Sequence, residues 1–396
     1  MEKQKNEPAL RFPEFSGDWE RKTLGEVINN KSGKYNPERE IESFKCIELE
    51  HLASETGQLL GFVDSAYSGS IKNRFETGDV LFGKLRPYLK KYLQAPFNGV
   101  CSSEIWVLKG KSIANDFLYR IVQTDYFIDL ANQSTGSKMP RADWDVVSSG
   151  IFPIPSLTEQ QKIASFFTAV DDKLTQLKKK KSLLEQYKKG VMQNIFSQEI
   201  RFKDEDGKEF PKWDKKKLGE VCEIIGGGTP ETNNKEYWNG NIQWFTPTEI
   251  KSDFVSKSYR NITELGLKKS SAKILPMGAI LLTTRATIGE VSIALEECTT
   301  NQGFQSLIVK EKNHNIFIFN WIKENKFEFV KRANGSTFAE ISKSAIEQIN
   351  ILIPCFAEQI KIAHFLSAID EKINHCHAQI EKSEQWKKGL LQKMFV

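Results

Sequence analysis

The chain has 396 residues, of which 39% are hydrophobic, including 26 phenylalanines and 8 tryptophans. This length excludes a single small module and predicts two to four globular units, and the composition excludes a chain that is disordered throughout. The 56 lysines and arginines outnumber the 51 aspartates and glutamates, giving a net charge of +5 that permits nucleic acid as a partner without requiring it. A polar start and the lack of an apolar run of about 20 residues predict a cytoplasmic protein without a membrane span.

The first half of the chain reads as a mixed α+β domain over residues 1–155. Short β-branched and aromatic runs at Asp79–Phe82 and Glu104–Leu108 are typical of strands. The stretch 116–130 favours a helix. Between the two strands lies Gly83–Lys91, a loop that alternates cations with an aromatic side chain.

A long helix is predicted next, over residues 156–197. From Ile163 to Ile195 the apolar or seam positions alternate in steps of four and three, which is the heptad pattern of a coiled coil, and no proline interrupts it after Pro155. At about 1.5 Å per residue, some 40 residues make a rod about 60 Å long. Lys188 occupies a seam position, where its charge weakens the packing and marks either a register device or a partner surface.

The second half repeats the first. Glu159–Phe166 returns as Glu358–Phe365, 199 positions later, and the opening Trp19–Val27 returns as Trp213–Val221. The repeat predicts a second α+β domain over residues 198–353.

A second helix is predicted over residues 354–396, with Lys387 at the seam position equivalent to Lys188. Neither helix can bury its apolar stripe alone, so we expect the two seams to pair as an antiparallel coiled coil that separates the domains and relates them by a pseudo-twofold axis. The alternative is that each helix packs only on its own domain.

Familiar catalytic machinery is missing from the chain. The glycine-rich stretch Gly226–Pro230 reads as a turn because Pro230 and the lack of a following helical pattern do not suit a dinucleotide loop. The six cysteines are scattered and read as buried, reduced thiols. His375–His377 is the one tempting metal cluster, but neighbouring residues of a helix point about 100° apart and cannot readily close on one ion. These absences favour a binding protein with no catalytic residue, resident cofactor or metal site.

Basic and hydroxyl-rich loops follow the predicted strands in both halves. Arginine and lysine suit guanine edges and phosphates, threonine offers a hydroxyl and a methyl group, and asparagine or glutamine can read adenine. The candidates are Lys84, Arg86, Tyr88, Lys90 and Lys91 in the first half, and Thr284, Arg285, Thr287, Asn301 and Gln302 in the second. Ordinary solvated loops remain the alternative interpretation.

Four motifs that recur in order in both halves carry a resemblance to a known family. They are the Glu-Gln-x-Lys-Ile-Ala-x-Phe helices, the Trp-x-x-Lys-x-Leu-Gly-Glu-Val openings, Gly136–Arg141 and Gly335–Ser342. Together they resemble the DNA specificity subunit of type I restriction-modification enzymes. The resemblance implies two target recognition domains that each read one half of a bipartite, asymmetric site in double-stranded DNA. It also implies that Ser137, Lys138, Arg141, Ser336 and Thr337 lie near the DNA.

The same resemblance implies partners. Two modification subunits would supply S-adenosylmethionine and adenine-N6 methylation, and restriction subunits would supply ATP- and Mg-dependent translocation and cleavage, while this chain stays noncatalytic. Two alternatives are a standalone DNA methyltransferase or nuclease with unfamiliar motifs, and a coiled-coil scaffold that binds no nucleic acid.

Overall fold

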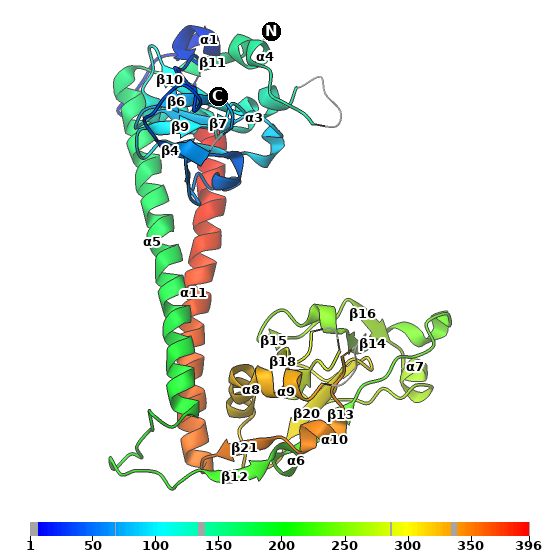
Figure 1. Ribbon diagram of the computed structural model, residues 1–396. Coiled ribbons are helices and arrows are strands. Elements are labelled where there is room, and N and C mark those ends of the chain that lie inside the picture. The colour runs from blue at the N-terminus through cyan, green and yellow to red at the C-terminus, as the bar shows by residue number, and fades with distance from the viewer. Residues whose placement is uncertain (1–6, 68, 134–138, 286, 334–338, 396) are drawn as a thin grey trace. The chain divides into compact units, whose positions relative to one another are not determined.

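The computed structural model describes residues 7–67, 69–133, 139–285, 287–333 and 339–395. The chain divides into two compact units (Figure 1). The first contains residues 1–179 together with 376–396, and the second contains residues 180–375. Each unit therefore combines a mixed domain with one part of each long helix.

The described strands of the first domain form three small sheets. Strand β1 (Glu20–Thr23) pairs with β11 (Ile151–Ile154). A four-stranded antiparallel sheet has the order β2 (Ile28–Asn29), β10 (Ile105–Gly110), β7 (Val80–Gly83) and β8 (Tyr92–Gln94). A five-stranded sheet has the order β3 (Lys34–Tyr35), β6 (Lys72–Phe75), β9 (Gly99–Cys101), β4 (Lys45–Ile47) and β5 (Val63–Asp64), and its β4 and β9 are parallel.

The helices of the first unit are mostly short. They are α1 (Leu24–Val27), α2 (Asn115–Ile121), α3 (Asp125–Asn132), α4 (Trp144–Ser149), the 3-10 turns η1 (Leu49–His51), η2 (Ser65–Tyr67) and η3 (Pro87–Leu89), and the long α5 (Leu157–Phe196). The prediction of one helix over 116–130 is wrong, because α2 and α3 are separate. The Thr124 hydroxyl accepts the Phe127 N–H at 3.3 Å and caps a new helix there.

The second domain repeats this plan with its own strand lengths. Strand β12 (Asp214–Lys217) pairs with β21 (Asn350–Ile353). The other two sheets have the orders β13 (Cys222–Gly226), β20 (Gln305–Val309), β17 (Ile280–Leu282), β18 (Val291–Ala294) and β15 (Phe254–Val255), and β16 (Arg260–Ile262), β14 (Trp238–Phe245) and β19 (Cys298–Thr300). Strand β14 pairs with β19 in parallel, as β4 pairs with β9 in the first domain, and β15 also pairs with β18 in parallel.

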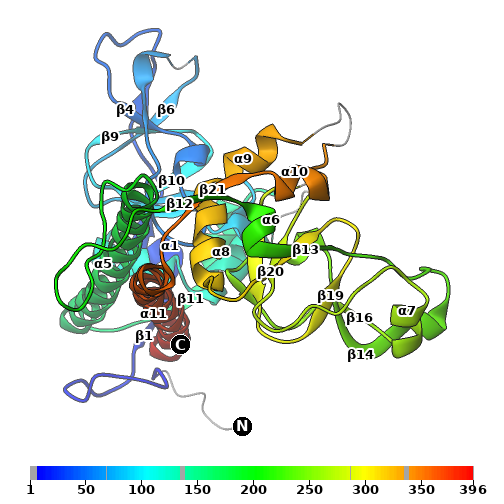
Figure 2. The same ribbon diagram turned by 90° about the horizontal axis from the view of Figure 1, so that it is seen from below.

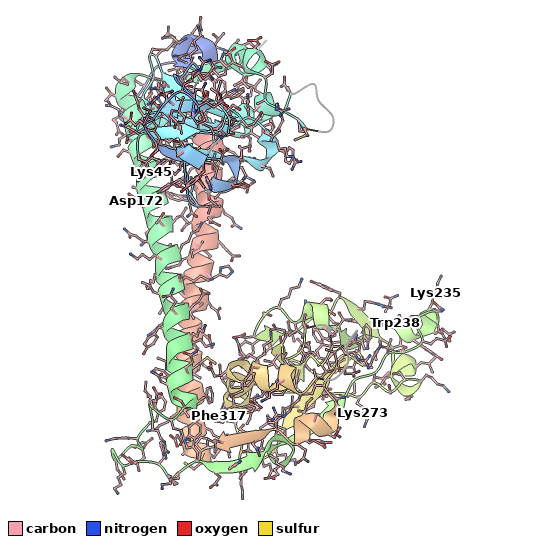
Figure 3. All side chains as sticks on the ribbon, in the orientation of Figure 1. Lys45, Asp172, Lys235, Trp238, Lys273 and Phe317 are labelled. Carbon is pink, nitrogen blue, oxygen red and sulfur yellow. The ribbon has the colours of Figure 1, made fainter. Side chains whose placement is uncertain are left out.

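Short helices also connect the strands of the second domain. They are α6 (Leu218–Val221), α7 (Glu264–Lys268), α8 (Asn315–Glu324), α9 (Lys326–Lys331), α10 (Lys343–Glu347), η4 (Lys235–Tyr237), η5 (Pro247–Glu249) and the long α11 (Phe356–Met394). Phe317 of α8, labelled in Figure 3, is buried and packs its ring against Trp213 and Phe196. The core of the domain thus continues onto the end of α5.

The two long helices pair within each unit and run side by side (Figure 1, Figure 2). In the first unit, Phe167 of α5 shares a core with Met394 of α11, whereas Leu177, further along α5, shares a cluster with Ile380. Residue numbers rise along one helix as they fall along the other, so the pair is antiparallel. In the second unit, α5 and α11 likewise contribute Ile195 and Ile362, among others, to one shared core. The predicted α+β class with an antiparallel coiled coil is confirmed, and the alternative of separately packed helices is wrong.

Candidate nucleic-acid interface

Three segments of the first domain meet beside the end of β7. The Lys84 N–H donates to the Glu104 carbonyl at 2.9 Å, and the Lys84 carbonyl accepts the Ala142 N–H at 2.8 Å. The Arg86 N–H donates to the Pro140 carbonyl at 2.8 Å. These main-chain bonds join the loop after β7, the loop before β10 and the segment before α4 into one surface, which we call the loop cluster.

Cationic side chains gather on this cluster. Arg141 donates to the Glu104 carboxylate through Nε at 3.0 Å and Nη2 at 3.3 Å, and this hydrogen bond raises the pKa of the Arg141 guanidinium. Within the described ranges, the side chains of Lys84 and Arg86 have no ion-pair partner. Arg86 is exposed and holds a left-handed backbone with φ of 53°, followed by Pro87. The cluster therefore offers two uncompensated cations beside a guanidinium held by its carboxylate, which suits phosphates and guanine edges.

The other candidates of this loop are placed differently. Lys91 donates from Nζ to the Leu49 carbonyl at 2.6 Å, and Lys90 pairs with Asp125 at 3.2 Å. Both ammonium groups are thus used inside the domain. Tyr88 projects with 52% of its surface exposed. The structure brings Lys84, Arg86 and Arg141 together, and gives Lys90 and Lys91 other partners.

The second domain builds the same cluster from different residues. The Thr284 N–H donates to the Gly303 carbonyl at 2.8 Å, and the Thr284 carbonyl accepts the Ile341 N–H at 3.3 Å. Arg285 forms a bridge with Glu340 in the main chain, and its Nη2 lies 2.9 Å from the Glu340 carboxylate. The two domains therefore have similar main-chain bonding at the cluster, while the side chains there differ.

The candidate threonine side chains of the second domain differ in solvent exposure. Thr284 is fully buried, and its Oγ1 has no hydrogen-bond partner among the described residues. Thr287 is exposed, and its N–H donates to the Arg285 carbonyl at 2.6 Å. Arg285 and Thr287 can reach a ligand in this conformation, whereas the Thr284 side chain points into the domain.

The candidate amides border the same cluster. Asn301 accepts the Gly303 N–H through Oδ1 at 2.8 Å, and its amide nitrogen has no acceptor among the described residues. Exposed Gln302 accepts the Thr229 hydroxyl. A Cβ at Gly227 would lie 2.0 Å from the Asn301 carbonyl oxygen. Residues 226–230 were predicted as a turn, but Gly226 ends β13 and residues 227–230 continue as irregular backbone, which needs glycine at position 227 because it packs closely on this loop.

The remaining loop candidates, Ser137, Lys138, Ser336 and Thr337, lie outside the described residues.

A second set of functional residues, missed by the sequence reasoning, joins each domain to its helices. Glu358, at the start of α11, is fully buried and accepts from Arg201 at 2.7 and 3.1 Å and from the Trp213 indole at 3.1 Å. In the first unit, Glu159 of α5 accepts from Arg11 at 2.7 and 2.8 Å. The repeated glutamate is therefore an anchor for the segment that enters each domain. The sequence signal that could have predicted this anchor is the Arg-Phe dipeptide, which occurs at residue 11 and again at residue 201.

The repeated glutamine completes each joint. Gln160 accepts the Ala114 N–H at 2.9 Å and donates to the Pro155 carbonyl at 2.9 Å. Gln359 accepts the His314 N–H at 2.8 Å and donates to the Pro354 carbonyl at 3.0 Å. In each unit, one glutamine side chain thus links the start of a long helix to a residue of the domain, the one before α2 in the first unit and the one before α8 in the second.

The described part of the chain shows neither a metal-binding cluster nor a membrane-spanning helix. No group of three or more histidine, cysteine, aspartate and glutamate side chains there could hold a metal ion. All six cysteines are free thiols, and burial raises the pKa of Cys222 to about 12, which disfavours the thiolate. None of the described helices is long and apolar enough to cross a membrane.

The family model described as "Type I restriction modification DNA specificity domain" matches the chain twice, over residues 16–186 and 211–383. This match, together with two mixed domains that are each joined to part of a long helix pair, identifies the class of protein as DNA specificity proteins. This chain belongs to that family. Family membership confirms the prediction of a noncatalytic specificity subunit rather than a methyltransferase or nuclease.

Named relatives agree with the family match. The MjaIX specificity subunit of Methanocaldococcus jannaschii is 39% identical over 207 residues, which cover 51% of this chain and 48% of the relative. The HindI specificity subunit of Haemophilus influenzae is 23% identical over 421 residues, covering 85% of this chain and 90% of the relative. The crystal structure of the S subunit from M. genitalium has a TM-score of 0.62 at 13% identity, covering 98% of this chain and 99% of that one, which shows a shared fold.

Proposed function

We propose that this chain is the DNA-recognising subunit of a type I restriction-modification complex, and that each domain reads one half of a bipartite, asymmetric site. The loop cluster carries this proposal. Two of its main-chain bonds recur in both domains, yet it presents Lys84, Arg86 and Arg141 in one domain and Arg285 and Glu340 in the other. Two surfaces built alike but with different chemistry suit two different half-sites.

The energetics of base recognition favour two reading domains. If each domain reads three or four base pairs at about 1–3 kcal/mol per pair, one domain alone discriminates too weakly to single out a site in a genome. Two domains carried by one chain make the second engagement intramolecular, so their discriminations combine. Half-sites read from one face of the duplex would have centres about 34–36 Å apart.

In this proposal the chemistry belongs to partner subunits. Two modification subunits would bind S-adenosylmethionine and methylate adenine at N6, and restriction subunits would use ATP and Mg to translocate and cut the DNA. The complex would work in the cytoplasm on double-stranded DNA, and this chain would hold none of these cofactors.

The experiment that tests the proposal is a methylome. The chain would be expressed with its modification subunit in an unmethylated host, and N6-methyladenine would be mapped by single-molecule sequencing. A bipartite motif with one fixed gap is the expected result. Methylation by the chain alone would favour the standalone methyltransferase, and a stable complex with no salt-dependent DNA affinity would favour the scaffold.

Arg285 provides a residue-level test of the second domain. Arg285→Ala should relax base preference in the second half-site by about 1–3 kcal/mol and leave the first half-site unchanged. Lys208→Ala, which removes an exposed cation ahead of β12, is the matched control. A uniform loss of affinity across all sequences, with a smaller salt dependence, would instead make Arg285 a phosphate contact.

Exposed aromatic side chains at equivalent positions of the two long helices support the binding of two copies of one partner. Tyr187 of α5 and Trp386 of α11 are 199 positions apart, and each is 53% exposed. Aromatic side chains of this size are enriched among residues that dominate binding energy at interfaces. We assign one modification subunit to each aromatic side chain.

Native mass spectrometry of the assembled complex checks this assignment. Tyr187→Ala and Trp386→Ala should each reduce the bound modification subunits from two to one, and the double variant should bind none. Met277→Ala removes a side chain that is 72% exposed in the second domain and should leave the complex unchanged. Full assembly of the double variant would place the docking surface elsewhere.

A further inference from the structure

Two lysines occupy positions in the apolar seam between the long helices. In the second unit, Lys188 of α5 is buried, and its Nζ lies 2.6 Å from the Asp370 carboxylate of α11. In the first unit, Lys387 of α11 lies 2.8 Å from Asp171 of α5, with 14% of its side chain exposed. Each lysine therefore reaches across the seam to an aspartate on the opposite helix.

The two contacts are copies of one another. Lys387 follows Lys188 by 199 positions, and Asp370 follows Asp171 by the same 199. The two helices exchange roles between the copies: the lysine comes from α5 in the second unit and from α11 in the first. Duplication has thus kept both halves of the ion pair, and the pairing is reciprocal.

Stability alone explains these pairs poorly. Desolvation of a buried ion pair offsets much of its attraction, and well-packed apolar residues would fill the seam at least as well. Burial lowers the pKa of Lys387, while Asp171 opposes this shift. A polar group inside a coiled-coil seam has another use: it is satisfied in only one register, so it specifies that register.

Further charges connect each pair to its domain. In the first unit, Arg120 of α2 donates to Asp171 at 2.5 Å and to the Thr168 hydroxyl at 2.9 Å, and only 3% of its side chain is exposed. The seam carboxylate is therefore shared between Lys387 of α11 and an arginine of the domain.

The second unit makes the same connection through a different carboxylate. Lys188 also lies 4.0 Å from Asp253, which precedes β15, and Asp253 pairs with Lys323 of α8 at 2.6 Å. In both units a chain of charges runs from the seam to the helix that follows the central strands of the domain.

We propose that the Lys188–Asp370 and Lys387–Asp171 pairs are register locks, which fix each domain at one axial position on the helix pair and thereby hold the gap of the bipartite site to a single length. This inference rests on the proposed function. A slip of one heptad moves the helices by about 10.5 Å, which is the rise of about three base pairs, and a slip of one residue moves them by about 1.5 Å. Either slip would leave both lysines without their aspartates inside the seam.

The test measures gap preference separately from base preference. The assembled complex with its modification subunits would bind duplexes that carry the methylome-defined half-sites at the native gap and at gaps one to three base pairs shorter or longer. Lys188→Met and Lys387→Met keep the aliphatic stem and remove the charge. We expect each to reduce the preference for the native gap about tenfold, while the base preference of each half-site stays unchanged.

Matched variants separate register from general stability. Lys178→Met removes an interhelical pair with Glu384 that is exposed on both sides and should leave gap preference unchanged. The reversed pair, Lys188→Asp with Asp370→Lys, should restore much of the lost preference. Asp370→Asn serves as a near-isosteric second variant if Lys188→Met does not fold.

Two results would overturn the inference. One is an unaltered gap preference in folded complexes of both methionine variants, and the other is an equal loss in Lys178→Met. A wild-type complex that binds all gaps alike would overturn the proposed function itself, and this inference with it.

Discussion

The joint at Glu358 makes a directional prediction about stability. Arg201→Ala leaves a fully buried carboxylate with the Trp213 indole as its remaining donor among the described residues. Stranding one partner of a buried ion pair costs about 3–5 kcal/mol. Glu358→Ala should cost less, about 2 kcal/mol, because Arg201 keeps the Phe210 and Pro211 carbonyls as acceptors and remains partly exposed.

A double variant isolates the cause. Arg201→Ala combined with Glu358→Gln removes the stranded charge and keeps a polar group of similar size, so it should recover part of the loss seen in Arg201→Ala. Because two domains need not unfold in one step, urea unfolding would be combined with hydrogen exchange of amides in β12, β21 and the first turns of α11. Equal losses for the two single variants, or no recovery in the double variant, would refute the reasoning.

Three further predictions concern single residues. Thr124→Ala removes the cap of α3 and should lower the free energy of unfolding by about 1 kcal/mol, measured by thermal denaturation. Gly227→Ala places a Cβ 2.0 Å from the Asn301 carbonyl oxygen, so the segment after β13 must move, and binding to the second half-site should weaken in a mobility-shift assay while the first is unaffected. Burial, and secondarily His364, lowers the pKa of His314 from 6.5, so the unfolded chain binds the proton more readily and stability falls as the pH drops below about 6.5. Calorimetry at pH 7 and pH 5 should show a smaller difference for His314→Asn than for the wild type.

The long helices were predictable because their signal is periodic. A heptad pattern over 40 residues and its copy 199 positions later leave few alternatives, and the antiparallel pairing follows from burying two stripes. The break between α2 and α3 was missed because residues 116–130 suit a helix throughout. Its local signal was Thr124 followed by Asp125, a capping residue and an acidic first turn.

For the candidate site, the sequence indicated residue types but not the directions in which their side chains lie. Lys84 and Lys91 stand in one basic run, yet a tight turn sends the Lys91 ammonium to a main-chain carbonyl and leaves Lys84 without an ion-pair partner among the described residues. Thr284 had suitable chemistry but is buried. Such outcomes depend on turn geometry and on contacts with distant segments, which a linear pattern of residue types does not encode.

Comparing the two halves of the chain separates geometry from specificity. The groups that repeat are those that set positions: the glutamate and glutamine of each joint, the seam lysine and aspartate, and the main-chain bonds of the loop cluster. The groups that differ are side chains presented by that cluster, such as Arg141 in one domain and Glu340 in the other. A protein that reads two different half-sites at one fixed gap requires this division, since base preference must be free to change while the spacing is held. Substitutions in the cluster should therefore alter which bases are read, and substitutions in the seam should alter how far apart they are read.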